Sequence, residues 1–413
     1  LFDLDNFKGV NDTLGHSVGD LLLQQAARRI EACLRVDDLA ARLGGDEFAI
    51  VVGGAVSQTM AARLAERIVQ ELRRPFDIDG HVVTSGASVG VAMAPRDGHD
   101  AERLLRAADL ALYAAKAKGR GGFQFFAPEM DEALQARQKL EADLRAALSE
   151  GALDVHYQPQ IDIKTLKMCG CEALVRWRHR ERGDISPAEF IPMAEDAGLI
   201  GQIGQFVLRR ACEDAARWPG HVKVAVNLSP AQFKTGDVLQ VVTQALAQSG
   251  LTPARLDLEI TEALIMQRDE RTLRTLTSLR NLGVGVSLDD FGTGYSSLSY
   301  LSSFPFTKIK IDQSFVRGLS ARADCRAIVR AVVSLGASLG MRVNAEGVER
   351  QEDLAYLKAE GCHEAQGFLF SRARPAGELF PALADGERRA ESLPQKLTRL
   401  PALPPILRRA DKA

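Results

Sequence analysis

The sequence Glu172-Ala173-Leu174-Val175-Arg176-Trp177 places an acid and an arginine in a short apolar run that is typical of a β-strand. Between residues 151 and 385, seven further segments of this kind carry a polar residue at or near one end. The polar residues of the eight segments are, in order, Gln158, Glu172, Asn227, Glu259 with Glu262, Asp289 with Asp290, Lys310 with Asp312, Glu346 with Glu349, and Gln366. Acids at strand ends are costly unless a cation collects them. The repeated order of strand, polar residue and helix therefore predicts a (β/α)₈ barrel with a metal site at the carboxyl ends of its strands.

Length and composition limit the classes of protein to consider. The chain has 413 residues, which suggests two or three domains, and 46% of them are apolar. The formal net charge of −2 gives no general attraction to a nucleic acid polymer or an anionic membrane. No apolar stretch is long enough to span a bilayer, and no signal peptide is visible. Six cysteines without a C-x-x-C pair are more typical of buried thiols than of redox or metal sites, which favours a reducing, cytoplasmic compartment.

The first residues, Leu1-Phe2-Asp3-Leu4-Asp5, show the alternation of apolar and polar residues that is typical of a β-strand. They are therefore interpreted as the last part of a strand. We therefore expect an N-terminally truncated fragment, from which an upstream sensor domain is missing. A membrane anchor of the parent protein would lie in the same missing part.

Four segments follow one another along the chain. Residues 1–127 alternate strands with helices, which predicts an α/β domain. The predicted helices of this domain are residues 18–34, 59–72 and 100–118, and its predicted strands are residues 39–43, 48–52 and 82–94. Residues 128–150 are rich in Ala, Leu and charge and predict one connecting helix, and residues 151–385 carry the barrel pattern. Residues 386–413 contain four prolines and no stable period, so we expect a disordered tail.

The barrel candidates have a common chemistry. Glu172, Asn227, Glu259 and Asp289 offer only oxygen donors, which select Mg²⁺ or Mn²⁺ over Zn²⁺. Asp290 could help to hold a second ion, and paired ions suit in-line attack on a phosphodiester. Any one acid of this set is more often structural or solvent-exposed than functional. The joint pattern is more specific, because each strand would need its own coincidence.

Glu172-Ala173-Leu174-Val175-Arg176-Trp177 resembles the signature of the EAL-domain cyclic-di-GMP phosphodiesterases, and the resemblance covers about 230 residues. It implies that Glu172, Asn227, Glu259 and Asp289 bind metal, that Asp290 binds the second metal, and that Asp312 supports both. Lys310 matches the lysine that orients the attacking water, and Glu346 matches an acid linked to the metals or to base catalysis. The resemblance also implies that Glu262 anchors the loop of residues 290–297. Substrate-groove positions are matched by Gln158, Arg176 and Gln366, and Glu349 matches a further acid near the site.

A second acidic motif lies in the first domain. Gly44-Gly45-Asp46-Glu47-Phe48 predicts a hairpin turn that carries two acids, and Asp3 at a strand end can approach the same point. Three carboxylates around Mg²⁺ and a triphosphate would make a nucleotidyl-transfer site. A polar hairpin tip without further function is the alternative on the pentapeptide alone.

Residues 3–20, from Asp3 to Asp20, together with this hairpin resemble the GGDEF diguanylate cyclase domain. The resemblance implies that Asp3 and Glu47 bind metal and that Asp46 is linked to metal or to activation of the 3′-hydroxyl. It further implies guanine contacts from Asn11 and Asp20, phosphate contacts from Lys8, Lys116 and Arg120, and an inhibitory site at Arg35 and Asp38. An ordinary surface ion pair is the alternative for these last two. The opening helix and first half-strand of the family would precede Leu1, which puts cyclase activity of this chain in doubt.

The sequence therefore predicts a truncated GGDEF domain followed by an EAL-type TIM-like barrel. The barrel would cut cyclic-di-GMP to linear pGpG, and the first domain would make cyclic-di-GMP from two GTP or bind GTP and regulate the barrel. A homodimer is expected from both resemblances, because the cyclase reaction needs two GTP-loaded domains facing each other. The alternative is a non-catalytic receptor that binds cyclic-di-GMP and signals through protein contacts.

Overall fold

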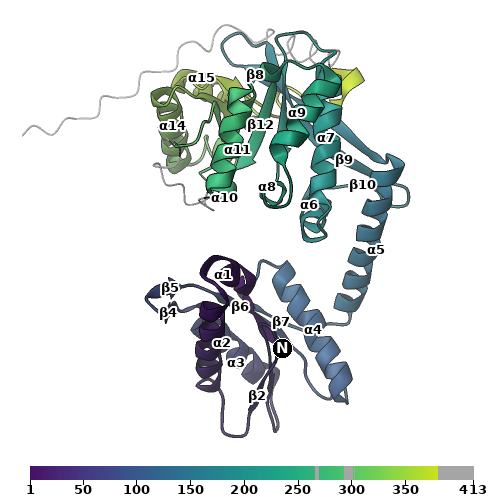
Figure 1. The fold of residues 1–413 in the computed structure, drawn as a ribbon, viewed down its shortest axis with the longest axis vertical. Coiled ribbons are helices and arrows are strands. Elements are labelled where there is room, and N and C mark those ends of the chain that lie inside the picture. The colour runs from purple at the N-terminus through teal and green to yellow at the C-terminus, as the bar shows by residue number, and fades with distance from the viewer. Residues whose placement is uncertain (266–268, 293–300, 302, 380–413) are drawn as a thin grey trace, which may run out of the picture. The chain divides into compact units, whose positions relative to one another are not determined.

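The computed structural model describes residues 1–265, 269–292, 301 and 303–379. The chain divides into two compact units, Leu1–Leu140 and Glu141–Ala413, and each is described by itself (Figure 1). The predicted tail of residues 386–413, and most of the predicted loop of residues 290–297, lie outside the described residues.

The first unit is built on a five-stranded sheet with the order β2-β3-β1-β6-β7. Its strands are β1 (Phe2–Asp5), β2 (Leu39–Gly44), β3 (Glu47–Val51), β6 (Gly86–Val91) and β7 (Phe123–Phe125), and β4 (Phe76–Ile78) pairs with β5 (His81–Val83) apart from it. Its helices are α1 (Phe7–Leu14), α2 (His16–Glu31), α3 (Gln58–Arg73) and α4 (Ala101–Ala117). The predicted α/β domain is thus confirmed.

Helices cover both faces of this sheet. Val89 of β6 belongs to the core that α2 and α3 form with β1 and β3. The next residue, Gly90, faces the other way, because a Cβ there would lie 2.0 Å from the backbone oxygen of Ala108 in α4. Figure 1 accordingly shows α2 and α3 on one side of the strands and α4 on the other.

One predicted strand is divided in the structure. Residues 82–94 were expected to form a single strand, but β5 ends at Val83 and β6 begins at Gly86. Ser85 lies between them and donates a hydrogen bond to the backbone oxygen of Asp5. A Cβ at Gly86 would lie 2.8 Å from Asp5 Oδ2, so the Asp5 side chain lies directly against the point where the chain enters the main sheet. The sheet neighbour, rather than the local apolar pattern, sets this boundary.

A single helix, α5 (Glu129–Glu150), occupies the segment predicted to be one helix. Its last turns lie in the second unit, where Leu144 is fully buried. Asp143 Oδ2 lies 3.1 Å from His179 Nε2 at the end of β9. This end of α5 is therefore packed against the barrel.

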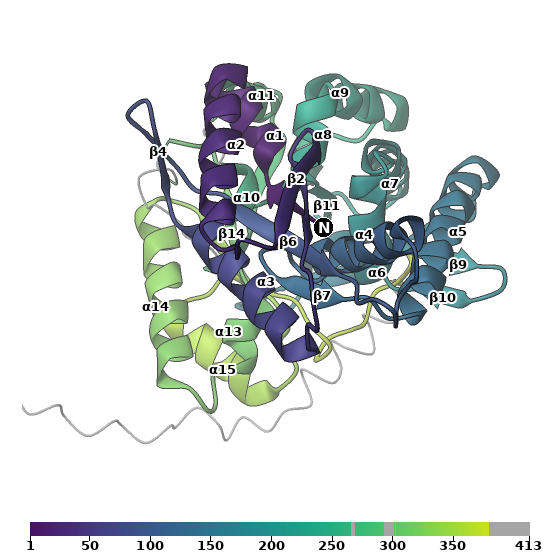
Figure 2. The ribbon, with the colours of Figure 1, turned by 90° about the horizontal axis from the view of Figure 1, so that it is seen from below.

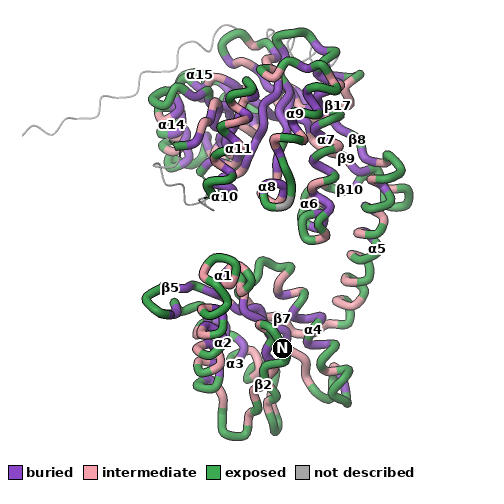
Figure 3. Tube along the Cα trace, viewed as in Figure 1, coloured by how far each residue is buried: buried purple, intermediate pink, exposed green. Residues whose placement is uncertain are grey.

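The second unit is a closed barrel of eight strands in the order β9-β11-β12-β13-β14-β15-β16-β8, with β8 pairing back to β9. The barrel strands are β8 (Leu153–Asp162), β9 (Met168–His179), β11 (Lys223–Leu228), β12 (Leu256–Thr261), β13 (Gly285–Phe291), β14 (Lys308–Ile311), β15 (Arg342–Ala345) and β16 (Glu364–Ala365). Two short strands, β10 (Gly183–Ile185) and β17 (Arg374–Pro375), extend the sheet. Figure 3 shows the strands buried inside the surrounding helices.

The helices of the barrel unit follow its strands. They are α6 (Pro187–Asp196), α7 (Ile200–Ala215), α8 (Pro230–Thr235), α9 (Val238–Ser249), η1 (Pro253–Arg255), α10 (Glu262–Ile265), α11 (Glu270–Asn281), α13 (Gln313–Arg317), α14 (Ala323–Ser338) and α15 (Gln351–Glu360). Figure 2 shows α14 beside α15, where Arg330 and Glu360 form an ion pair at 3.0 Å. No helix of the described ranges is long and apolar enough to cross a membrane.

The barrel departs from a strict repeat of strand and helix at its first strand. Strand β8 runs antiparallel to both β9 and β16, whereas the other seven strands are parallel to one another. Only residues 163–167 connect β8 to β9, and a parallel crossover needs about a dozen residues or more. The connection is therefore a turn, and seven strands rather than eight point their carboxyl ends to one face.

Candidate active site

Lys310 lies at the centre of the barrel site, with its side chain 1% exposed. Its Nζ atom is 2.6 Å from Glu259 Oε2, 2.6 Å from Glu346 Oε1 and 3.1 Å from Asp289 Oδ1. Glu172 Oε2 is further away, at 3.8 Å. Acids from four different strands or strand ends, β9, β12, β13 and β15, thus meet at one ammonium group.

Negative charge exceeds positive charge at this point. The carboxylates of Glu172, Glu259, Asp289, Asp290 and Glu346 gather around the single ammonium of Lys310. Burial raises the pKa of Glu346 to about 8, and neighbouring acids add to the effect. Burial also raises the pKa of Glu259 well above its usual range, whereas the surrounding acids raise the pKa of Lys310 against the effect of its burial. A site with this excess of buried carboxylate attracts further cations.

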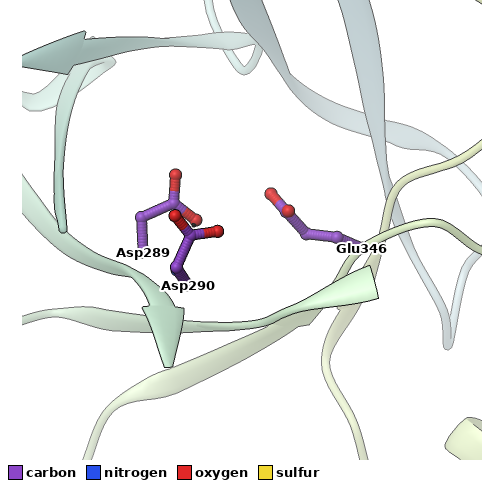
Figure 4. A group of neighbouring side chains, drawn as sticks. All are labelled: Asp289, Asp290 and Glu346. Carbon is purple, nitrogen blue, oxygen red and sulfur yellow. Dashed lines mark hydrogen bonds between the residues drawn. The ribbon is translucent and has the colours of Figure 1, made fainter. Parts of the chain in front are cut away.

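Three of the carboxylates form a group that could hold a metal ion. One oxygen each of Asp289, Asp290 and Glu346 lies within 4.8 Å of the others, and Figure 4 shows the two aspartates facing Glu346 from the end of β13. Consecutive residues of a strand normally point to opposite faces. Here the pairing of β13 shifts between Leu288 and Phe291, and Asp290 adopts a left-handed backbone with φ 53°. This local distortion turns both aspartates toward the same point.

Glu172 is held by amide groups. Asn227 Nδ2 donates to Glu172 Oε1 at 2.7 Å, and Gln366 Nε2 donates to Glu172 Oε2 at 2.5 Å. Because its Nδ2 is engaged, Asn227 has its carbonyl oxygen left as a ligand atom. Gln366 also donates to Gln158 Oε1 at 3.0 Å, and Gln158 donates to the backbone oxygen of Ser371. Of the two residues predicted to lie in the substrate groove, Gln366 therefore contacts Glu172 directly, and Gln158 is connected to Glu172 through Gln366.

Three further predicted residues of the barrel are in different situations. Arg176 donates to the backbone oxygen of Val175, and burial lowers the pKa of Arg176. Asp312 is the N-cap of α13, accepts a hydrogen bond from Ser314 N at 2.9 Å, and contributes to raising the pKa of Asp290, whose main cause is burial. Glu349 is exposed and pairs with Arg317 at 3.1 Å.

Glu262, the predicted loop anchor, is the first residue of α10 and is 6% exposed. Neither of its carboxylate oxygens has a hydrogen-bond partner among the described residues. Residues 293–297 of the loop lie outside those residues, so the anchoring role stays a prediction.

Sequence reasoning missed a second set of polar residues inside the barrel. They are Gln160, Asp257, Lys308 and Glu364, each at most 5% exposed. Each stands two positions from a predicted site residue on the same strand, as Lys308 does from Lys310. Because side chains of a strand alternate between its faces, this two-residue period could have placed them on the same inner face.

The first unit brings its three predicted metal-binding acids together. Asp3 pairs in register with Glu47, and the backbone of Leu4 donates to the backbone oxygen of Asp46. Burial raises the pKa of Asp3, and the nearby charge of Asp46 acts in the same direction. Lys116, predicted to bind phosphate, forms an ion pair with Asp3 Oδ2.

The two predicted guanine contacts are in different situations, and only Asp20 shares a pocket with residues of the hairpin strands. Asn11 Oδ1 is buried without a hydrogen-bond partner among the described residues, and a Cβ on Gly19 would lie 1.9 Å from it. Gly19 therefore leaves room for the Asn11 amide. Asp20 lines a pocket of about 390 Å³ with residues of α2, β2 and β3, including Leu23 and Arg42.

The remaining predicted residues of the first unit are on its surface. Lys8 and Arg120 are exposed, and Arg120 has a left-handed backbone with φ 60°. In the predicted inhibitory site, Asp38 Oδ2 accepts a hydrogen bond from the backbone nitrogen of Arg35 at 2.9 Å. Arg35 is exposed, so its guanidinium remains accessible to an anion.

Comparison with known families identifies both units. The EAL domain family matches residues 141–373, more than half of the chain, and the family described as diguanylate cyclase, GGDEF domain, matches residues 1–122. The chain therefore belongs to the EAL-domain family and carries a GGDEF domain before its EAL domain.

Relatives with the same two domains are known. MucR of Pseudomonas aeruginosa, a bifunctional diguanylate cyclase/cyclic di-GMP phosphodiesterase, is 44% identical over 386 residues, which cover 92% of this chain and 56% of MucR. The cyclic di-GMP phosphodiesterase PdeR of Escherichia coli is 41% identical over 377 residues, covering 91% of this chain and 57% of PdeR. The structure of the MucR phosphodiesterase in its c-di-GMP complex has 43% sequence identity and a TM-score of 0.57, covering 58% of this chain and 99% of that one. The chain spans about half the length of the curated relatives it matches.

Proposed function

We propose that the barrel hydrolyses one phosphodiester bond of cyclic-di-GMP to give linear pGpG. The observation that carries the proposal is the set of five carboxylates around Lys310, an excess of negative charge that divalent cations would compensate. The names of MucR and PdeR, and the c-di-GMP complex of the MucR phosphodiesterase, support the choice of substrate.

The donor set fits Mg²⁺ or Mn²⁺, because its members offer oxygen atoms and because Asp289, Asp290 and Glu346 already lie within reach of one ion. The residues proposed to hold the ions are Glu172, Asn227, Glu259, Asp289 and Asp290, with Asp312 as a supporting acid. When bound, the ions would polarise the phosphate and neutralise the charge that develops on it.

The side chains of the barrel have separate roles in this proposal. Lys310 orients the attacking water, since its ammonium is fixed by Glu259 and Glu346 at 2.6 Å each. Glu346 accepts the proton of that water, because its carboxylate lies beside the ammonium that orients the water. The water oxygen bonds to phosphorus, the bond from phosphorus to the 3′-oxygen breaks, and the leaving 3′-oxygen takes up a proton to become the 3′-hydroxyl of pGpG. Arg176, Gln158 and Gln366 hold the dinucleotide, and Glu262 anchors the loop that carries Asp290.

For the first unit we propose GTP binding, with Asn11 and Asp20 on the guanine and with Lys8, Lys116 and Arg120 on the phosphates. Two separate observations support this proposal: Asn11 Oδ1 has no hydrogen-bond partner among the described residues, and Asp20 lines a pocket; both side chains offer acceptor oxygens for the N–H donors of guanine. Asp3 and Glu47 would hold metal, and Asp46 would bind metal or activate the 3′-hydroxyl, for the synthesis of cyclic-di-GMP by two facing copies. Regulation of the barrel by bound GTP without synthesis is the second proposal for the same site. Arg35 and Asp38 are proposed to bind the product.

The test is chromatography of cyclic-di-GMP incubated with the 413-residue chain and Mg²⁺ or Mn²⁺. We expect pGpG to accumulate, and Glu346→Gln to reduce its rate by at least about a hundredfold while substrate still binds. Glu213→Gln is the matched control, since Glu213 pairs with Arg209 on the outside of α7. Binding of cyclic-di-GMP without any pGpG in the parent protein would instead support the receptor alternative.

A further inference from the structure

A second polar layer lies inside the barrel, next to the layer that forms the candidate active site. Lys308 is at its centre, 3.1 Å from Asp257 Oδ2 and 2.8 Å from Glu364 Oε2. Lys308 also donates to Gln160 Oε1 at 3.3 Å. These four residues come from β14, β12, β16 and β8, so the layer joins strands on different sides of the barrel.

The charges of this layer are balanced. Asp257 Oδ1 accepts a further hydrogen bond from Ser287 at 2.8 Å, and Glu364 Oε1 pairs with Arg342 at 2.8 Å. The nearby acids raise the pKa of Lys308 against the effect of burial, so the ammonium stays charged. Lys308 thus has two carboxylate partners in its own layer, and its charge also acts on Glu259 of the active site.

Two glycines leave space for this layer. A Cβ on Gly170 of β9 would lie 3.1 Å from Gln160 Oε1, and a Cβ on Gly285 of β13 would lie 2.9 Å from Asp257 Oδ1. Gly170 is the register partner of Gln160, and Gly285 is the register partner of Asp257. The strands on either side are therefore shaped around the polar groups, rather than around an apolar plug.

Gln160 connects the two layers. Its Nε2 donates to Glu259 Oε1 at 3.4 Å, whereas its Oε1 accepts from Lys308. An ammonium group only donates and an ionised carboxylate only accepts. Lys308 therefore fixes the orientation in which the amide presents its N–H to Glu259. Lys310 occupies the other oxygen of Glu259 at 2.6 Å.

Stability alone does not account for this arrangement. Replacing a buried ion cluster by apolar residues of similar volume is often neutral or stabilising. An amide held in one orientation against a metal-binding carboxylate, in contrast, fixes the direction of that carboxylate, as partners of metal ligands do in general.

We propose that Gln160, oriented by Lys308, is a positioning residue that sets the direction of Glu259 for metal binding. The proposal rests on the proposed function, because it takes Glu259 to be a metal ligand. Loss of the amide donor should then weaken the metal site and lower kcat, with little effect on substrate affinity.

The experiment compares Gln160→Leu and Gln160→Glu with the parent 413-residue chain. Gln160→Glu keeps the shape of the side chain and its contact with Lys308, but has no N–H for Glu259. Tyr157→Phe is the control, because it removes another buried hydrogen bond from β8, the one from Tyr157 to Asp214 at 2.7 Å. Mn²⁺ affinity is measured by calorimetry on metal-stripped protein, and kcat and KM by pGpG formation.

We expect both Gln160 variants to bind Mn²⁺ about tenfold more weakly and to lose about tenfold in kcat, with KM changed less than about twofold. Tyr157→Phe should match the parent in Mn²⁺ affinity and in kcat. Parent-like Mn²⁺ affinity in Gln160→Glu would overturn the positioning role alone, and this variant decides the question if Gln160→Leu does not fold. A parent protein that neither binds Mn²⁺ nor forms pGpG would overturn the proposed function itself.

Discussion

Replacing Lys310 by methionine tests how much the ammonium of Lys310 contributes to the stability of a barrel that buries several acids. The ammonium lies 2.6 Å from both Glu259 Oε2 and Glu346 Oε1, and each contact has a gross Coulomb energy of about 6 kcal/mol at an effective dielectric constant of about 20. Much of this is offset by the cost of burying the charges. Removing one partner of a buried ion pair costs about 3–5 kcal/mol net. We expect Lys310→Met to lower the free energy of unfolding of the metal-free barrel by this amount at pH 9.

The loss should depend on pH. Burial raises the pKa of Glu346 from 4.5 to about 8, so between these values the folded parent binds a proton that the unfolded chain has lost. The stabilisation from this proton is complete below pH 4.5 and is lost as the pH rises through about 8. The charge of Lys310 lowers the pKa of Glu172, Glu259 and Glu346, so these three pKa values should be higher in the variant. The stability of the variant should therefore fall more steeply with pH, by about 1.4 kcal/mol per pH unit for each additional bound proton.

The assay is urea denaturation of metal-stripped protein at pH 6 and pH 9, followed by tryptophan fluorescence. Both tryptophans of the chain, Trp177 and Trp218, lie in the barrel unit, so the signal reports on that unit alone. Lys164→Met, at an exposed lysine in the turn after β8, is the matched control. Added Mn²⁺ should recover part of the loss, because it supplies the missing positive charge. If Lys310→Met is within about 1 kcal/mol of the control at pH 9, the range of a surface ion pair, the electrostatic reasoning is refuted.

Three further predictions concern single side chains. Glu172→Ala should reduce hydrolysis of cyclic-di-GMP by at least about a hundredfold while the barrel remains folded, as circular dichroism can verify; near-parent turnover would show that Glu172 is not a ligand. Glu262→Ala should lower kcat, because its buried carboxylate would no longer anchor the loop that carries Asp290; unchanged kinetics and unchanged metal dependence would contradict this. GTP should change the rate of the barrel through a coupling of about 1–3 kcal/mol without being consumed, and Asp20→Ala should abolish the effect; equal rates with and without GTP in both proteins would exclude regulation.

The barrel site was predictable because several strands each supplied an independent polar residue. Lys310 and the acids around it came from separate segments, and the structure brings them together. The hairpin of Gly44 to Phe48 was predictable for a local reason, since Gly45 has the positive φ of 51° that its turn requires.

Other features depend on neighbours that are distant in sequence. The boundary at Gly86 is set by Asp5 on another strand, and the orientation of both Asp289 and Asp290 depends on an irregular pairing of β13 with β14. The reversed direction of β8 was predictable in principle from its short connection to β9. A two-residue period likewise indicated that Lys308 faces the inside of the barrel. The residues that contact Lys308 could be named only from the fold.

The most direct test of the account is turnover of cyclic-di-GMP by metal-stripped protein as a divalent ion is added back. We expect no pGpG in excess chelator, and activity that rises with Mg²⁺ or Mn²⁺ to saturation. Ca²⁺ should bind the same oxygen donors but support little turnover, because its longer and looser coordination misplaces the attacking water. Full pGpG formation in excess chelator would contradict the claim that the acids around Lys310 act by binding metal.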